Sequence, residues 1–187
     1  MSTPMPARAT IAIFASDRGP GDAERASIMA QAGNYFARRG ARLICLADGD
    51  VVPVPLITSA RTSGGEVVVV GGPGLVLPSA LGAIPVETFA TSTERMKRVA
   101  ELAGAFVGLP GSFASASSLY STWVQAGGGA GGKPVVLYNR NNAFEVLRGF
   151  AADVLAHSVS GHERVVQFAD SIEDVWNRLA RLMPELR

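Results

Sequence analysis

Short apolar runs, each bounded by glycine, proline or polar residues, recur along the chain. Runs of this length and setting are typical of strands that are buried on both faces of a sheet. We therefore predict strands at Thr10–Ala15, 42–46, 66–70, 105–109 and 134–138, and a shorter strand at 164–168.

Longer segments between these runs carry apolar residues at the spacing of an amphipathic helix. The first is 22–39, where Asp22 can cap the start and Gly40 follows the end. Further helices are predicted at 55–63, from 92 or 93 to 103, after a turn at 110–115, at 142–156, and from 170 or 171 to the C-terminus. Residues 71–91 are rich in glycine and proline and are predicted to run over the surface, with 84–89 extended. This alternation predicts an α/β fold, a Rossmann-like doubly wound parallel sheet with helices on both faces.

The composition fits one well-packed domain. Of 187 residues, 48% are hydrophobic and 18% are charged, which excludes disorder as the main state. We expect a flexible tail at 1–8 and a single nucleotide-binding domain at 9–187. The formal net charge of +1 argues against a nucleic-acid partner, and no apolar run is long enough to span a membrane. Because Cys45 is the only cysteine and the N-terminus lacks an apolar signal core, we expect a cytoplasmic protein.

In an open sheet of this kind, ligands bind in the turns after the carboxyl ends of the strands. Three turns compete for this role, at 16–21, 47–54 and 110–115. The third is the most specific, because small residues at a helix start leave backbone N–H groups free beside the positive end of the helix dipole. Together with the hydroxyls of Ser112 and Ser115, this turn predicts a phosphate site. The alternative is that these serines only cap the helix.

The residues before this turn form a charged helical segment, Glu94-Arg95-Met96-Lys97-Arg98, and then a buried strand. The stretch from Glu94 to Gly111 resembles the core of the LONELY GUY family, also known as lysine decarboxylase-like proteins. Members carry a Glu-Arg-Lys helix and then Pro-Gly-Gly-x-Gly-Thr-x-x-Glu. The resemblance continues through 133–139 and, more weakly, over nearly the whole chain. It implies a Rossmann-like fold, a homodimer with ligand sites near the subunit interface, and cleavage of the N-glycosidic bond of a nucleoside 5′-monophosphate, with no cofactor.

The resemblance assigns roles to individual positions. Arg95 falls on the family's catalytic arginine, and Arg98 lies one turn later at a basic or polar position that would bind substrate. Ser118 stands where the family has its catalytic glutamate. The turn that would hold the phosphate consists of Pro110, Gly111, Ser112, Phe113, Ala114 and Ser115, in which Ser112 and Ala114 replace glycines and Ser115 replaces threonine.

The replacement of glutamate by Ser118 bears directly on the chemistry. Cleavage of an N-glycosidic bond builds positive charge on the sugar ring, which a nearby carboxylate stabilises. A serine offers a hydrogen bond but no negative charge, and the loss of a positioned acid or base costs on the order of 10²- to 10⁴-fold in rate. The backbone N–H groups of the turn remain, so the site is expected to hold a nucleotide without cleaving it efficiently.

The turn at 46–54 also departs from the family, which has a glycine-rich loop after its second strand. Here Asp48 and Asp50 flank Gly49, the one glycine of this stretch. Negative charge repels phosphate, but it can hold sugar hydroxyls or replace the missing glutamate. The alternative is that both aspartates are turn residues that face water.

Other reactive or aromatic side chains point to structure more than to chemistry. His157 and His162 flank a turn without further ligands at metal spacing, so we expect a surface loop and no metal site. Cys45 lies in a predicted buried strand and is expected in the core. Trp123 and Tyr120 can stack on a base, or pack against the sheet or a partner.

Three hypotheses follow from these residues. The first is a LONELY GUY-like protein that binds a nucleoside monophosphate or a related phosphorylated ligand, with weak or altered phosphoribohydrolase activity. The second is a fully active enzyme that uses a substitute acid and a changed substrate. The third is a non-catalytic oligomeric scaffold or regulatory protein that kept the fold and lost the site.

Overall fold

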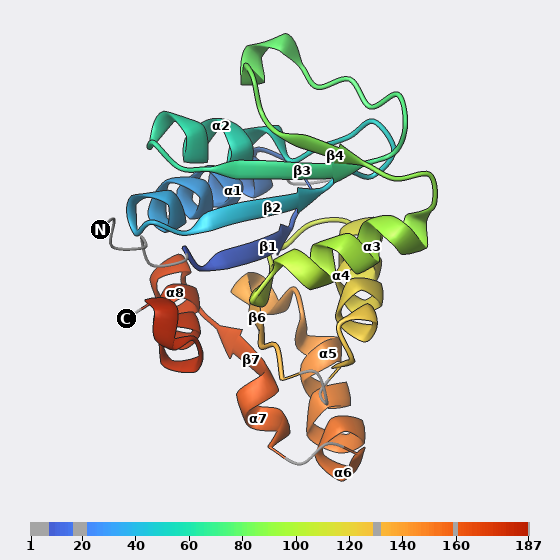
Figure 1. The fold of residues 1–187 in the computed structure, drawn as a ribbon. Helices are drawn as coiled ribbons and strands as arrows, with labels where there is room; N and C mark the ends of the chain where they lie inside the picture. Colours follow the sequence, from blue (N-terminus) through green and yellow to red (C-terminus); the bar gives the residue numbers. More distant parts are fainter. Residues whose placement is uncertain (1–7, 17–21, 129–131, 159–160, 187) are drawn as a thin grey trace, which may run out of the picture.

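The computed structural model describes residues 8–16, 22–128, 132–158 and 161–186. Within them, one parallel sheet has the strand order β4-β3-β2-β1-β5-β6-β7 (Figure 1). The strands are β1 (Thr10–Phe14), β2 (Arg42–Leu46), β3 (Val67–Gly71), β4 (Val86–Thr88), β5 (Ala105–Gly108), β6 (Val135–Tyr138) and β7 (Val166–Ala169). The predicted tail lies outside the described residues, apart from Arg8.

Helices connect the strands and cover both faces of the sheet (Figure 1). They are α1 (Asp22–Arg38), α2 (Val54–Thr62), α3 (Ser92–Leu102), α4 (Phe113–Gln125), α5 (Glu145–Phe150), α6 (Ala156–Ser158), α7 (His162–Val165) and α8 (Ile172–Leu182). Shorter turns are η1 (Ser79–Leu81), η3 (Arg140–Asn142), the π-helical η4 (Ala151–Leu155) and η5 (Pro184–Leu186). The predicted Rossmann-like fold is thereby confirmed.

The sheet separates two hydrophobic cores. In β1, Ile11 and Ile13 face the core under α1, α2 and α8, whereas Ala12 and Phe14 face the core under α3, α4 and α5. This alternation follows from the two-residue period of a strand. Because both faces are covered, the strands are apolar throughout, which is the pattern that made them recognisable in the sequence.

Two predicted elements differ from the structure, and both lie near the C-terminus. The helix predicted at 142–156 instead starts at Glu145, because Asn141 and Asn142 adopt φ values of 54° and 58° that no α-helix accepts. It then passes through the π-helical turn η4 into α6. The strand predicted at 164–168 is β7 and starts at Val166, after the helical turn α7. The extended segment predicted at 84–89 is confirmed as the edge strand β4.

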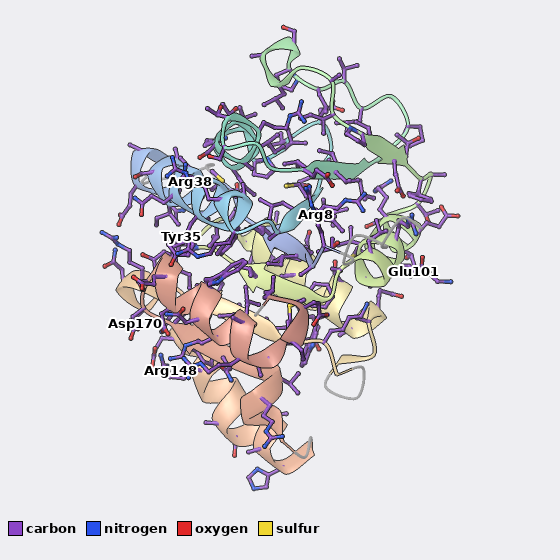
Figure 2. All side chains as sticks on the ribbon, turned by 60° about the vertical axis from the view of Figure 1, so that its left-hand side comes forward. Arg8, Tyr35, Arg38, Glu101, Arg148 and Asp170 are labelled. Atoms are coloured by element: carbon purple, nitrogen blue, oxygen red, sulfur yellow. The ribbon has the colours of Figure 1, made fainter. Side chains whose placement is uncertain are left out.

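Helix α5 rests on the β6–β7 end of the sheet. Figure 2 shows the side chain of Arg148, whose guanidinium carbon lies 4.7 Å from the centre of the Phe168 ring on β7. Phe144, just before α5, is buried in the same core as Leu119 and Trp123 of α4. Both helices therefore share one face of the sheet.

Among the described residues, every helix is too short or too polar to span a membrane.

Candidate functional site

The strand order reverses between β1 and β5, because the chain first builds the sheet outward to β4 and then returns through α3 to the other side of β1. Loops that leave adjacent strands in opposite directions open a crevice at their carboxyl ends. A small cleft of about 30 Å³ lies at this point. Its walls come from the ends of β1 and β2 with the residues that follow them, and from the first turns of α4. This volume holds roughly one water molecule.

The turn from β5 into α4 supplies the polar wall of this cleft. Ser112 is the N-cap of α4, and its hydroxyl accepts a hydrogen bond from the Ser115 N–H at 3.1 Å. In return, the Ser115 hydroxyl accepts from the Ser112 N–H at 3.0 Å, which completes a capping box. Ser112 and Ser115 therefore cap the helix, as the alternative interpretation of the sequence predicted. They also line the cleft, so capping and a polar cleft wall coexist in the same side chains.

Two N–H groups of the first turn remain available. The capping box satisfies those of Ser112 and Ser115, and Ala116 donates to the Ser112 carbonyl at 3.2 Å. In the described part of the chain, the N–H groups of Phe113 and Ala114 have no such partner. They lie at the positive end of the helix dipole, where an anion is stabilised.

Gly111 sits where two backbone segments approach closely. A Cβ atom at this position would lie 2.9 Å from the backbone nitrogen of Ser16 and 2.5 Å from the Ser115 hydroxyl. Neither distance accommodates a methyl group. The glycine is therefore required by the contact between the β5–α4 turn and the residues after β1.

Ser118 and Asp48 face the same cleft from different elements. Ser118 lies in the second turn of α4, and Asp48 follows β2. The Asp48 backbone exchanges two hydrogen bonds with Val51, at 2.9 and 3.0 Å, which closes the turn that carries Asp50 at its exposed tip. Asp48 is the one carboxylate among the described residues that line the cleft, and Asp50 does not line it.

Arg95 and Arg98 lie on α3 and do not line the cleft. The Arg95 guanidinium donates to the carbonyl groups of Phe89 at 2.9 Å and Ala90 at 3.3 Å. Arg98 forms a two-pronged pair with Glu87 of β4, at 2.6 and 3.2 Å, and lies 3.7 Å from Glu101. This pairing lowers the pKa of Glu87 and raises that of Arg98, mainly through their hydrogen bonds. The structure therefore gathers the serines of α4 but keeps both arginines in contacts with other groups.

A larger cavity, of about 720 Å³, opens on the other side of α4, between this helix and α5. Its floor is apolar and includes Leu119, Trp123, Leu137 and Phe144. Pro110, Gly111, Ser112 and Phe113 line it as well, and Ser112 also lines the small cleft. Of the turn residues singled out in the sequence, Ala114 lines neither hollow.

Arg25 is not among the candidate residues that the sequence pointed to. It lies in the first turn of α1 and lines the cavity together with Gly111 and Ser112. Its position just after the loop that follows β1 was a usable signal, because that loop starts at the carboxyl end of the sheet.

The remaining candidate residues are Cys45, His157 and His162. Cys45 is fully buried in β2, and burial raises the pKa of its thiol to about 12. The Nδ1 atom of His157 lies 2.6 Å from the backbone carbonyl oxygen of Asp153, and the His162 side chain lies outside the described set. Among the described residues, no three His, Cys, Asp or Glu side chains cluster as metal ligands.

Comparisons with known proteins place the fold. No protein-family profile matches the sequence, and no curated protein matches it. Among solved structures, the protein TM1055 superposes with a TM-score of 0.68 and 16% identity, over 92% of this chain and 99% of its own. The Moco carrier protein from Chlamydomonas reinhardtii has a TM-score of 0.69 and 15% identity, over 95% of this chain and 99% of its own.

A third similar structure is the molybdenum cofactor binding protein from the phototrophic bacterium Rippkaea orientalis. Its TM-score is 0.67 at 13% identity, over 94% of this chain and 98% of its own. At these identities the likeness establishes the fold. The Rossmann-like architecture is shared over almost the full length of each protein, and it agrees with the fold implied by the resemblance to the LONELY GUY family.

Proposed function

We propose that this protein binds a phosphorylated small molecule, with a nucleoside 5′-monophosphate as the leading candidate, and that its phosphoribohydrolase activity is weak or altered. The observation that carries the proposal is the polar wall of α4 at the switch point of the sheet. In the described part of the chain, the N–H groups of Phe113 and Ala114 at this helix start have no hydrogen-bond partner, and the hydroxyl-bearing residues Ser112 and Ser115 line the adjoining cleft. Such a helix start favours a phosphate.

Positive charge supports the same assignment. Arg25 reaches the hollow that Gly111 and Ser112 also line, and a guanidinium is well suited to pair with phosphate oxygens. Arg95 and Arg98 keep the roles that the resemblance implies only as second contributors, because neither lines the cavity. Each has to give up a partner before it can contact a ligand, Arg95 the Phe89 carbonyl and Arg98 the Glu87 carboxylate.

Weak cleavage follows from Ser118. In N-glycosidic hydrolysis, water adds to the ribose C1′ atom, the bond to the base breaks, and the base leaves with a proton. Ser118 lines the cleft without a charge that could stabilise the cationic ring. We therefore expect the protein to release base at a rate on the order of 10²- to 10⁴-fold below that of a site with the glutamate.

Isothermal titration calorimetry tests the binding claim with a panel of nucleoside monophosphates. We expect heat with at least one of them, and a loss of that heat when Gly111 is replaced. We add the molybdenum cofactor to this panel as a second candidate ligand of a different class, because two of the similar structures are named for carrying or binding it. If no member produces heat, the scaffold hypothesis takes the place of the binding claim.

A fully active enzyme is the second candidate function, and the position of Asp48 favours it. This carboxylate lines the cleft with Ser118, whereas Asp50 does not. Chromatography of nucleotide incubations decides between the candidates. Release of base that Asp48→Asn abolishes and Asp50→Asn leaves intact would identify Asp48 as the substitute acid. Ser118→Glu is the complementary variant, because base release that appears only in it shows that the rest of the site is competent.

A homodimer is the proposed assembly. In the described residues, most of the large exposed apolar side chains lie on α4, α5 and η4, namely Phe113, Tyr120, Val124, Val146 and Val154. Concentrated apolar exposure of this kind marks an interaction surface. Val124 and Val154 lie outside the lining of the α4–α5 cavity, so a partner can cover them without filling it. Light scattering tests this, with a dimer mass expected for the protein and a monomer mass for Val124→Glu.

A further inference from the structure

The small cleft and the large cavity differ in what they can hold. The cleft has a volume of about 30 Å³ and the α4–α5 cavity about 720 Å³. Pockets that bind drug-sized ligands measure roughly 300 to 1,000 Å³. The cleft is therefore too small for a base and a ribose, whereas the cavity is large enough for the body of such a ligand.

The two hollows meet at the start of α4, since Ser112 lines both. Gly111, Ser112 and the charged residue Arg25 also line the cavity. The rest of its lining is largely apolar and aromatic, with Leu119, Trp123 and Phe144 from both sides of the gap. A charged residue together with an aromatic interior matches a molecule that has an anion at one end and a flat ring at the other.

Trp123 adds an independent observation. Its side chain is 8% exposed and lines the cavity, and its indole N–H is buried without an acceptor in the described part of the chain. Because this N–H has almost no accessible surface, the part of Trp123 that lines the cavity is apolar, and an aromatic ring can pack against it. Tyr120, 53% exposed, lies one turn before Trp123 and lines the cavity as well.

We propose that the α4–α5 cavity binds the aromatic ring of a phosphate ester whose phosphate rests against Arg25 and the first turn of α4. This inference rests on the proposed function for the position of the phosphate and adds the place and class of the rest of the ligand. Ser118 lines the cleft and not the cavity. A ring held in the cavity therefore keeps its glycosidic bond away from the Ser118 side chain, which favours binding over cleavage.

Tryptophan fluorescence tests the ring position, because Trp123 and Trp176 are the only tryptophans and lie in separate cores on opposite faces of the sheet. Trp176→Phe leaves Trp123 as the single reporter. Adenosine 5′-monophosphate is expected to change its emission, and ribose 5-phosphate is not. In the matched variant Trp123→Phe, the remaining Trp176 is expected to give no change with either compound.

Calorimetry measures the contribution of the ring. Adenosine 5′-monophosphate is expected to bind about tenfold to a hundredfold more tightly than ribose 5-phosphate, which is the range for one stacked base. Ser117 lines the cavity, so Ser117→Phe adds a ring inside it. This variant is expected to remove the difference between the two affinities and to leave the affinity for ribose 5-phosphate unchanged. Ser121→Phe is the matched control, since it adds the same group one turn later on α4 at a residue that does not line the cavity.

The outcomes separate this inference from the proposed function. Equal affinities for the two compounds, with a silent Trp123, overturn the ring site and leave phosphate binding intact. The absence of binding by both compounds and by every other member of the calorimetry panel overturns the proposed function itself. A Ser117→Phe variant with a changed molar mass and an unchanged nucleotide affinity shows that a second copy of the chain fills the cavity, and this also overturns the inference. The fluorescence measurement needs no filling variant, so it decides the matter even if Ser117→Phe does not fold.

Discussion

Single residues decide how closely the backbone segments approach at the carboxyl edge of the sheet. Gly111 is the clearest case, because a side chain there meets the backbone after β1 as well as the Ser115 hydroxyl. Backbone atoms cannot shift as cheaply as the end of a flexible side chain. The sequence motif singled out Gly111, and the structure supplies the physical reason for a glycine at this position.

We predict that Gly111→Ala destabilises the protein by about 1 to 3 kcal/mol, the usual cost of overpacking, and weakens phosphate binding because the turn moves away from β1. Chemical denaturation and calorimetry measure the two effects. Gly149→Ala is the control, since a Cβ atom at that position in α5 meets open space. Alanine is favoured over glycine in a helix, so Gly149→Ala is expected to be neutral or stabilising. Equal losses in both variants would contradict the role of the close approach.

The Arg98–Glu87 ion pair leads us to predict how the stability of the protein depends on pH. Hydrogen bonds from Arg98 lower the pKa of the Glu87 carboxyl from its ordinary 4.5. A lowered pKa in the folded state means that the pair stabilises the protein above pH 4.5 and that this contribution is lost as the pH falls through the lowered value. Since both side chains are about one-third exposed, we expect about 0.2 to 1 kcal/mol at neutral pH.

Urea denaturation of the protein and of Glu87→Gln across this pH range measures the contribution. Their difference is expected to shrink as the pH falls below 4.5 and to shrink in high salt. In an Arg98→Gln background, Glu87→Gln is expected to have little effect at any pH. A difference that stays constant down to acidic pH would show that Glu87 acts through packing and not through its charge.

At the scale of elements, α3 and α4 start with the same device. Thr91 caps α3 in a capping box with Glu94, and Ser112 caps α4 in a capping box with Ser115. Only the start of α4 borders the cleft and the cavity. The two helix starts have the same kind of capping hydrogen bonds. They differ in where they lie relative to the sheet, and only the start of α4 lies where a ligand can reach it in the proposed site.

We therefore predict that Thr91→Ala and Ser112→Ala each destabilise the protein by about 1 kcal/mol, the typical cost of losing an N-cap. Only Ser112→Ala is expected to weaken phosphate binding as well. Thermal denaturation followed by calorimetry with the same ligand compares the two variants directly. A parallel loss of affinity in Thr91→Ala would indicate that the binding defect reflects general destabilisation and not the hydroxyl in the cleft.

Element boundaries also show where local sequence reasoning succeeds and where it stops. The buried strands and α1 to α4 lie close to their predicted positions, since periodicity and caps are properties of neighbouring residues. The helix predicted at 142–156 starts later, at Glu145, and contains the π-helical turn η4. Before it, Asn139 accepts the Phe144 N–H at 2.7 Å and donates to Glu145 at 3.0 Å, which fixes a turn that an apolar pattern does not reveal.

At the scale of the whole molecule, the reactivity of the Cys45 thiol depends on whether the core is folded. It is fully buried in β2, in the core under α1, α2 and α8. Its thiol has a pKa of about 12 and so stays protonated at neutral pH. Both burial and protonation suppress its reaction with thiol reagents.

We predict that Cys45 is not labelled by a thiol reagent in the folded protein and that its labelling rate rises with denaturant in parallel with global unfolding. Mass spectrometry follows the modified fraction over time, and complete labelling in concentrated denaturant is the control. Rapid labelling without denaturant would mean that β2 opens locally, which its central place between β1 and β3 argues against.

The sequence by itself determined the alternation of strands and helices, the covered sheet and the turn at 110–115, because each depends on residues that are close along the chain. Only the tertiary structure decided which turns meet. It brought Asp48 and not Asp50 to the cleft, bonded Arg98 to an edge strand, and placed Arg25 in the lining of the same cavity as Gly111. It also left an aromatic cavity between α4 and α5. These juxtapositions depend on strand order and on the gap between two helices, which are properties of the packed chain and leave no local pattern in the sequence.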